Sequence, residues 1–233
     1  MFAGLVWVPS SKRRMQMALK NSFVRTVSGG GFLLVIFIFL FFNPITHIAL
    51  GKKALPPDFI GFIKMVENGN VGVLSGVYIP NVLALPVVQQ PVDDAGYVSA
   101  HNNEATQFAM ASQYGNIGIL AHNYLSGKLF SRLSVGEEVR LVYGDGKVEY
   151  FVITEVLRYQ ALEPNSQWSS FRSLDNYDVL SAEQMFTLAY AGDRHVTLQT
   201  CIASNGNSSW GRLFVIAVPK SFSFDHLIQQ VLQ

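Results

Sequence analysis

The stretch His195-Val-Thr-Leu-Gln-Thr-Cys201 is apolar and strand-like, and it ends in the only cysteine of this 233-residue chain. A second strand-like stretch, Arg212-Leu-Phe-Val-Ile-Ala-Val218, begins with an arginine, and a third, Gly118-Ile-Leu-Ala-His122, ends in a histidine. These segments make strands the main element of the predicted fold. A thiol, an imidazole and a guanidinium at the edges of three strands are also the components of an acyl-transfer site that uses a thiol.

The spacing of these residues bears on whether they can meet. Ser204-Asn-Gly-Asn-Ser-Ser209 reads as a surface turn, so we expect the strands that carry Cys201 and Arg212 to pair with both residues at one rim. A free thiol is only about 3% thiolate at pH 7, so a catalytic cysteine needs a base or a cation nearby. His122 can act as the base, and the rigid fork of donors on Arg212 can stabilise an oxyanion. Whether the strand of His122 lies alongside is left open by the spacing.

The composition indicates a folded chain and excludes several functions. Hydrophobic residues make up 49% of the chain and charged residues 14%, which is not the composition of a disordered protein. The net charge is +1, and no basic run extends beyond Lys12-Arg13-Arg14, so we expect no nucleic-acid partner. A single cysteine excludes an intrachain disulfide. No pattern of ligand spacing predicts a metal or another cofactor, and the adjacent acids Glu137 and Glu138 are only weak support for calcium.

An apolar run near the N-terminus predicts a membrane segment. Residues 32–42 read Phe-Leu-Leu-Val-Ile-Phe-Ile-Phe-Leu-Phe-Phe, and the milder flanks extend the run over 27–50, which is long enough to cross a bilayer. No acidic residue precedes Asp58, and the basic residues upstream of the run predict a cytoplasmic N-terminus: Lys12, Arg13, Arg14, Lys20 and Arg25. We therefore expect a cytoplasmic segment over 1–26, an uncleaved anchor over 27–50, a linker over 51–70 and an exported domain over 71–233. A cleaved signal peptide is the competing interpretation.

The exported part reads as short strands separated by turns. The segment Tyr143-Gly-Asp-Gly-Lys147 predicts a hairpin, and Ser181 with Gln184 resembles a capping box at the start of a helix. We expect helices over Glu104–Tyr114 and Ser181–Tyr190 and a long loop over 160–178. Regular short strands with few helices favour a closed or nearly closed β-barrel. The expected strands are 71–79, 83–88, 117–121, 138–143, 148–159, 196–201 and 213–218.

Residues from about 71 to 219 resemble a sortase, the membrane-anchored cysteine transpeptidase of bacterial surfaces. Thr197-Leu-Gln-Thr-Cys201 matches the TLxTC motif of the family, and Leu120-Ala-His-Asn123 stands where the family has its catalytic histidine. The stretches Gly127-Lys-Leu-Phe-Ser-Arg-Leu133 and Val135-Gly-Glu-Glu-Val139 resemble the segment that follows that histidine, and Arg212-Leu-Phe-Val215 resembles the start of the strand with the catalytic arginine. The His-Asn pair is most similar to class B members.

Two features depart from the family pattern. His122 and Cys201 are 79 residues apart (201 − 122), which is longer than is usual in sortases, and the surplus falls within residues 160–190. The corresponding loop in sortases helps to shape the peptide groove, so substrate preference is the property that this departure affects. Ala121 stands where the family often has glycine. Neither departure removes a chemical group.

The resemblance implies a mainly β fold, a closed barrel of about seven to eight strands with a few short helices, behind a transmembrane helix. It implies that Cys201 is the nucleophile, His122 the acid and base, and Arg212 the oxyanion group, with Thr200, Leu198 and Asn123 in substrate-binding or supporting positions. The implied substrates are exported proteins with a C-terminal sorting signal. The implied acceptor is an amine of a cell-wall peptide or a protein lysine, at the outer face of a membrane that the chain crosses once.

Two other functions stay open. The same site could hydrolyse its thioester, because nothing in the motifs decides between water and an amine. The chain could also be a membrane-tethered, non-catalytic barrel that binds peptide or glycan, with Cys201 as a buried apolar residue, which is the more common role of a free cysteine. Papain-like enzymes fit less well, because their cysteine precedes their histidine in the chain. Among the other histidines, His195 lies roughly 20 Å from Cys201 along one strand, and His101 is loop-like.

Overall fold

The computed structural model describes residues 57–221. The predicted anchor at 27–50 and the last twelve residues of the predicted domain lie outside this range. No helix within 57–221 is long and apolar enough to cross a membrane. The elements are α2 (Phe59–Val66), β1 (Leu74–Ile79), β2 (Leu83–Gln89), β3 (Ala105–Phe108), α3 (Ala109–Ser112), β4 (Ile117–Leu120), the 3₁₀ helix η1 (Ser126–Arg132), β5 (Glu138–Tyr143), β6 (Val148–Ala161), β7 (Phe171–Ser173), β8 (Val179–Leu180), α4 (Ala182–Tyr190), β9 (Val196–Ser204) and β10 (Asn207–Pro219).

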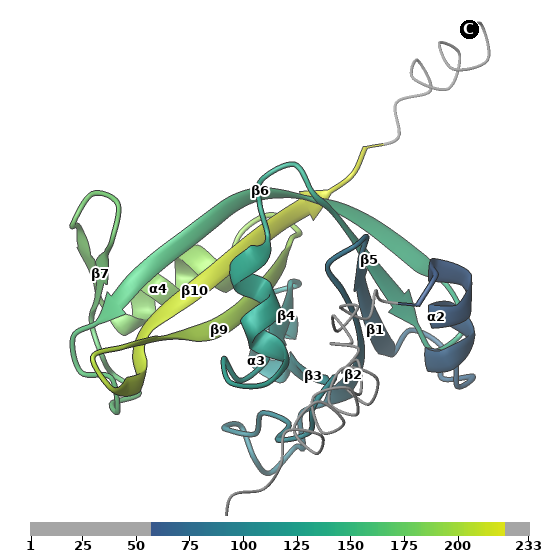
Figure 1. Ribbon diagram of the computed structural model, residues 1–233, viewed down its shortest axis with the longest axis horizontal. Coiled ribbons are helices and arrows are strands. Elements are labelled where there is room, and N and C mark those ends of the chain that lie inside the picture. The colour runs from purple at the N-terminus through teal and green to yellow at the C-terminus, as the bar shows by residue number, and fades with distance from the viewer. Residues whose placement is uncertain (1–56, 222–233) are drawn as a thin grey trace, which may run out of the picture. The chain divides into compact units, whose positions relative to one another are not determined.

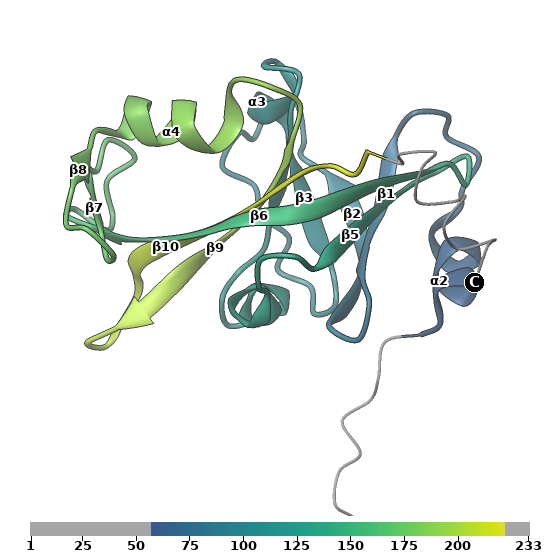
Figure 2. The ribbon, with the colours of Figure 1, turned by 90° about the horizontal axis from the view of Figure 1, so that it is seen from above.

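Eight strands close into a barrel, as the sequence predicts. The order is β10-β9-β4-β3-β2-β1-β5-β6, and β6 pairs back onto β10, so the sheet has no free edge along this circuit. Strands β7 and β8 extend the sheet beyond β6; β7 is labelled in Figure 1 and both strands in Figure 2. The pairs β2–β3 and β4–β9 are parallel, and the other neighbours are antiparallel. Closure removes the unpaired backbone groups that an open sheet would expose.

Alternation along each strand builds the core. In β2, Leu83, Leu85 and Val87 are buried while the residues between them are partly exposed. Inward-facing apolar residues of all eight barrel strands form one cluster inside the barrel. The predicted hairpin at residues 143–147 is confirmed, because it joins β5 to β6 with Gly146 at φ +79°. A positive φ is the conformation for which glycine is favoured in such a turn.

The helix α4 lies against the outside of the barrel. Its predicted capping box is present: the Ser181 side chain accepts from the backbone of Gln184, and the Gln184 side chain accepts from the backbone of Ser181. Its buried side chains, Met185, Ala189 and Tyr190, form a second cluster with residues on the outer surface of the strands. Figure 2 shows α4 along one side of β9 and β10. This face of the sheet is therefore partly covered.

The structure corrects the predicted helix over Glu104–Tyr114. Residues 105–108 form β3, and only 109–112 are helical. The strand is required by the barrel, since β3 pairs with β2 on one side, where Val87 faces Ala105, and with β4 on the other, where Thr106 faces Leu120. Pairing on both edges outweighs the helical propensity of this short, Ala- and Met-containing segment.

Two other segments hold more structure than the sequence indicates. The expected long loop over 160–178 contains the last residues of β6 and the short strand β7. The expected linker over 51–70 contains α2, whose Phe62 and Val66 are buried against Tyr78 and Val142 on the outside of β1 and β5. Packing of this apolar helix face explains why the part of the expected linker from Phe59 to Val66 is helical.

Candidate active site

The strand register brings the three predicted catalytic residues into one row. Cys201 lies directly opposite Arg212 in the antiparallel pair β9–β10. The parallel pair β4–β9 has a constant offset of 79 residues, from Ile117 facing Val196 to Leu120 facing Gln199. The backbone N–H of Ala121 donates to the Gln199 carbonyl oxygen at 3.2 Å, one step beyond the ladder. The same offset sets His122 beside Cys201, so the three backbones span about 10 Å.

The alternation of side chains puts the three residues on the same face. Ala121, Leu198 and Leu213 point into the barrel core. His122 and Arg212 are next to Ala121 and Leu213 in the chain, and Cys201 is an odd number of residues from Leu198, so all three point outward. The outer face of the same strands carries Gln199, whose side chain accepts a hydrogen bond from the Tyr190 hydroxyl of α4. His122, Cys201 and Arg212 are each partly exposed. A molecule in solution can therefore reach all three from the side of the barrel on which α4 lies.

Arg212 is held by backbone carbonyl oxygens. Its guanidinium donates to the carbonyl oxygens of Ser209 at 2.9 Å, Gly211 at 3.0 Å and Pro164 at 3.5 Å. The bond to Pro164 ties the segment between β6 and β7 to the site. Within residues 57–221 no carboxylate forms an ion pair with Arg212. An oriented, unneutralised guanidinium is suited to hold a developing negative charge.

A cavity of about 190 Å³ adjoins this side of the row. Gln199, Arg212 and Phe214 form its floor, and α4 and the segment after β6 form its walls. Burial raises the pKa of Tyr190, so its hydroxyl stays protonated and continues to donate to Gln199. The lining combines aromatic rings with a few polar groups, which is typical of a ligand-binding cleft. The other lining residues are Phe108, Gln167, Phe171, Ala182, Met185, Phe186 and Tyr190.

His122 is positioned by the turn that follows β4. Its carbonyl oxygen accepts from the N–H groups of Leu125 and Gly127, both at 3.0 Å. Its ring stacks on the ring of Tyr124, with the centroids 5.0 Å apart and the planes at 18°. Tyr124 is 64% exposed, so it covers the imidazole from the solvent side. Asn123 donates from Nδ2 to the Ser208 carbonyl oxygen at 2.8 Å and thereby links this turn to the β9–β10 hairpin.

The supporting residues of the sequence prediction act through the scaffold. The Thr200 hydroxyl donates to the Ala121 carbonyl oxygen at 2.8 Å, on the barrel side of the sheet, opposite to Cys201. Leu198 is fully buried in the core and contacts no open surface. The Thr197 hydroxyl donates to the carbonyl oxygen of Ala189 and fastens α4 to β9. The motif thus fixes the seam between β4 and β9 and one side of the cleft.

Sequence reasoning missed two residues beside the row. One is Tyr124, whose ring stacks on the ring of His122. The other is Glu104, which immediately precedes β3 and whose carboxylate accepts from the Ser99 hydroxyl. Glu104 could not be located from the sequence, because it was assigned to a helix rather than to the start of a strand.

The remaining candidates lie elsewhere. The ring nitrogens of His195 are 2.7 Å from the Asp193 carbonyl oxygen and 2.9 Å from that of Ala189, at the far end of β9 from Cys201. His101 is exposed. Glu138 forms ion pairs with Arg140 and Lys220. Burial raises the pKa of Glu138, but hydrogen bonds and charge from these two cations outweigh burial and hold that pKa below its usual value. No cluster of three His, Cys, Asp or Glu side chains occurs within 57–221.

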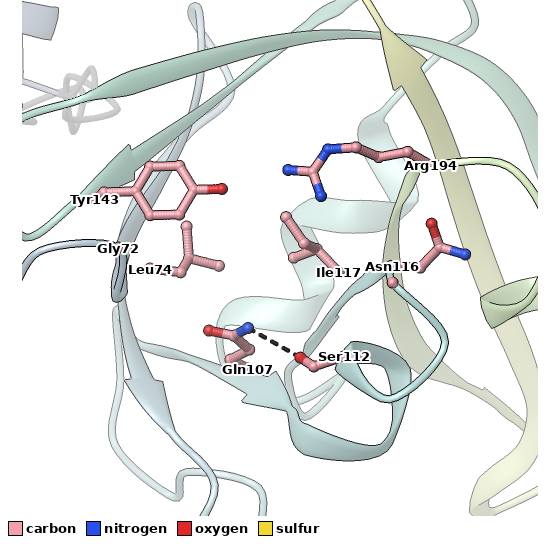
Figure 3. Close-up of a pocket in the computed structure, with 9 residues that line it drawn as sticks. Gly72, Leu74, Gln107, Ser112, Asn116, Ile117, Tyr143 and Arg194 are labelled. Atoms are coloured by element: carbon pink, nitrogen blue, oxygen red, sulfur yellow. Dashed lines mark hydrogen bonds between the residues drawn. The ribbon is translucent and has the colours of Figure 1, made fainter.

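A second cavity, of about 270 Å³, opens at the opposite end of β4 and β9. Figure 3 shows the Arg194 guanidinium and the Tyr143 hydroxyl directed toward each other across it. Glu149 binds both groups, at 2.5 Å and 3.0 Å, so the arginine at this cavity is already paired. None of the predicted site residues lines this cavity. The thiol, imidazole and unpaired guanidinium are all at the other end.

Comparison with known proteins identifies relatives by structure alone. No protein-family model matches the sequence, and no curated protein matches it. Many solved structures that are similar to this chain are sortases. One is sortase C from Clostridium perfringens SM101, with 16% identity and a TM-score of 0.40, over 71% of this chain and 76% of that one. Another is sortase A from Listeria monocytogenes, with 15% identity and a TM-score of 0.41, over 64% of this chain and 88% of that one. A third is sortase C-1 from Streptococcus pneumoniae, with 18% identity and a TM-score of 0.41, over 64% of this chain and 67% of that one.

These sortases belong to more than one class, so the subclass of this chain is not determined. At these identities and TM-scores, the case for the chemistry of the site rests on the motifs and contacts of this chain itself.

Proposed function

We propose that this protein is a sortase-type cysteine transpeptidase. It cleaves a peptide bond in a sorting signal through a thioacyl intermediate on Cys201 and transfers the acyl group to an amine. The observation that carries the proposal is the row of His122, Cys201 and Arg212 on one face of three neighbouring strands. A thiol alone, or a thiol with a distant base, would not support acyl transfer.

The first half-reaction forms the thioester. The Cys201 thiolate attacks the carbonyl carbon of the scissile bond, and the carbonyl oxygen becomes an oxyanion that the Arg212 guanidinium stabilises. The His122 imidazolium gives a proton to the leaving amine as the carbon–nitrogen bond breaks. The products are a thioacyl enzyme, a neutral imidazole and the C-terminal fragment of the substrate.

The second half-reaction returns the enzyme to its starting state. Neutral His122 accepts the proton of the incoming amine while that amine attacks the thioester carbonyl. The carbon–sulfur bond breaks, the thiolate leaves, and a new amide forms. Water in place of the amine would give a hydrolase. The cleft beside Arg212 is lined mainly by aromatic and apolar side chains, which disfavour water near the thioester.

The proposed location follows from the N-terminal sequence. An anchor over 27–50 with basic residues before it would hold residues 71–233 at the outer surface of the cell membrane. Exported proteins and the amines of the cell wall, or lysines of other exported proteins, would then be the substrates. This location also accommodates a free thiol that takes part in catalysis rather than in a disulfide.

The test is acyl transfer by the full-length chain in detergent micelles. The chain is incubated with a pool of sortase-type pentapeptides and hydroxylamine, and mass spectrometry detects peptide hydroxamates. Cys201→Ala removes the nucleophile, and Ser204→Ala, a change three residues further along β9, is the matched control. Hydroxamate that forms with the unaltered chain and the control but not with Cys201→Ala supports the proposal.

Two outcomes oppose it. Peptide cleavage without hydroxamate would identify a hydrolase. No cleavage and no hydroxamate over the whole pool would favour a binding module, and alkylation of Cys201 in the folded chain would then report whether the thiol is open to solvent.

A further inference from the structure

The register of β3 adds a fourth residue to the row. In the antiparallel pair β3–β4, Thr106 faces Leu120 and Phe108 faces Gly118. Continued by two residues, this register sets Glu104 opposite His122. Ala105 and Ala121, between these pairs, both point into the barrel core, so Glu104 and His122 share the outer face. Glu104, His122, Cys201 and Arg212 therefore follow one another across four neighbouring strands.

The Glu104 carboxylate is oriented by its own loop. One carboxylate oxygen accepts from the Ser99 hydroxyl, and the Ser99 backbone N–H donates to the Thr106 hydroxyl at 2.8 Å. The backbone N–H of Glu104 donates to the Ser126 hydroxyl at 3.0 Å, which connects the residue to the turn that follows His122. Both serines are buried. Ser99 thus holds the carboxylate of Glu104, and Ser126 holds its backbone.

Glu104 is partly buried, yet it carries no counter-ion. Within residues 57–221 no lysine, arginine or histidine forms an ion pair with Glu104. The nearest titratable neighbour in its loop is His101, whose backbone N–H donates to Ser99 while its side chain is exposed. The row therefore has an unpaired negative group at the His122 end and an unpaired positive group, Arg212, at the Cys201 end.

This polarity matches the two substrates of a transpeptidase. The acyl donor develops negative charge on its carbonyl oxygen, which belongs beside Arg212. A primary amine acceptor arrives in neutral water as an ammonium ion, and it must lose one proton before it can attack and a second as the amide forms. Tyr124 stacks on His122 and leaves much of its ring open, and an exposed aromatic face attracts ammonium groups.

We propose that Glu104 and Tyr124 form the acceptor subsite and bind the incoming amine as its ammonium ion beside His122. The inference rests on the proposed transpeptidase function and adds the charge state and the binding residues of the second substrate. The Glu104 carboxylate attracts the cation, and the Tyr124 ring supports it from the solvent side. His122 takes the first proton from the ammonium and passes it to solvent. Neutral again, it accepts the second proton while the amine attacks the Cys201 thioester and the thiolate leaves.

The test compares two acceptors of similar size, methylamine and hydroxylamine. Methylamine is a cation in neutral water and hydroxylamine is uncharged. The full-length chain is supplied with the pentapeptide that gives the most hydroxamate, and kcat/KM is measured for both amines. The readout is the ratio of the methylamine value to the hydroxylamine value, because general damage to the fold lowers both values and leaves their ratio intact.

Glu104→Gln should lower this ratio about fivefold, the effect of one partly exposed charge pair, and 0.5 M salt should reduce the difference. Tyr124→Leu should lower the ratio, whereas Tyr124→Phe, which keeps the ring, should preserve it. The matched control is Glu155→Gln, an exposed acid on β6.

An unchanged ratio in Glu104→Gln overturns the acceptor subsite and leaves the transpeptidase intact. Equal falls in the ratio for Glu104→Gln and Glu155→Gln also overturn it, because net charge alone would then explain the effect. Absence of hydroxamate with the unaltered chain overturns the proposed function, and the subsite with it.

Discussion

Removal of the Thr200 hydroxyl tests how the seam between β4 and β9 is held. Thr200→Val keeps the shape of the side chain and deletes the 2.8 Å hydrogen bond to the Ala121 carbonyl oxygen. Thr200 is 4% exposed and Ala121 7%, so water does not readily replace the lost donor. A net hydrogen bond is worth about 1 kcal/mol, and an unsatisfied buried carbonyl costs about 1–3 kcal/mol. We expect a loss of about 2 kcal/mol in the free energy of unfolding.

Urea denaturation of the full-length chain measures this loss, and thermal melting should show a fall in Tm of about 6 °C. Thr200→Ser, which keeps the hydroxyl, should lose less. Thr154→Val is the control, because the Thr154 hydroxyl bonds to the Ile216 carbonyl oxygen at 3.4 Å from an exposed position and should contribute less than about 0.5 kcal/mol. Equal effects of Thr200→Val and Thr154→Val would refute the assignment of Thr200 to the seam.

Three further predictions concern the turn, the far end of the barrel and the site. Gly127→Ala should destabilise the fold by about 1–3 kcal/mol, measured by urea titration. The reason is that a Cβ there would lie 2.2 Å from the Thr200 hydroxyl and 2.6 Å from a backbone oxygen. An unchanged midpoint of urea denaturation would mean that η1 can shift to make room. Burial raises the pKa of Glu149, but hydrogen bonds from Lys147, Arg194 and Tyr143 hold it below its usual value. Its contribution to stability is therefore present above the pKa of an unfolded glutamate, about 4.3, and is lost as the pH falls through the lower folded value. The difference in unfolding free energy between the unaltered chain and Glu149→Gln should therefore shrink as the pH falls below the pKa of an unfolded glutamate. A difference that stays constant with pH would contradict this role of Glu149. Arg212→Lys should lower kcat/KM at least tenfold in the hydroxamate assay, because an ammonium cannot reproduce the planar fork of donors. Near-normal activity would mean that a positive charge alone is sufficient at this position.

The strands and the barrel could be predicted from the sequence because their signals are local. The apolar runs that end in His122 and Cys201, and the Asp-Gly turn between β5 and β6, carry their structure in a few adjacent residues. The motif Thr197-Leu-Gln-Thr-Cys201 indicated Cys201 as the nucleophile, and the stretches Leu120-Ala-His-Asn123 and Arg212-Leu-Phe-Val215 indicated His122 and Arg212. The register of β4 beside β9, which sets His122 next to Cys201, is a long-range property that no local pattern contains.

The wrong secondary-structure prediction also comes from long-range pairing that local sequence does not reveal. Residues 105–108 were predicted as part of a helix over 104–114, and only pairing with both β2 and β4 makes them a strand. The mistake concealed Glu104, whose place opposite His122 follows from that pairing. Leu198, expected in a substrate-binding or supporting position, is buried in the core and supports β9 from inside the barrel. The anchor over 27–50 stays a prediction, since those residues lie outside the described part of the chain.

The most direct test of the central claim is the mass of the intact protein during the reaction. The full-length chain is mixed with an active pentapeptide, quenched in acid within seconds, and analysed by mass spectrometry with peptide mapping. The account predicts one acyl fragment on Cys201, released as hydroxamate when hydroxylamine is added, and no adduct in Cys201→Ala. Product that forms equally well in Cys201→Ala would contradict the assignment of Cys201 as the nucleophile.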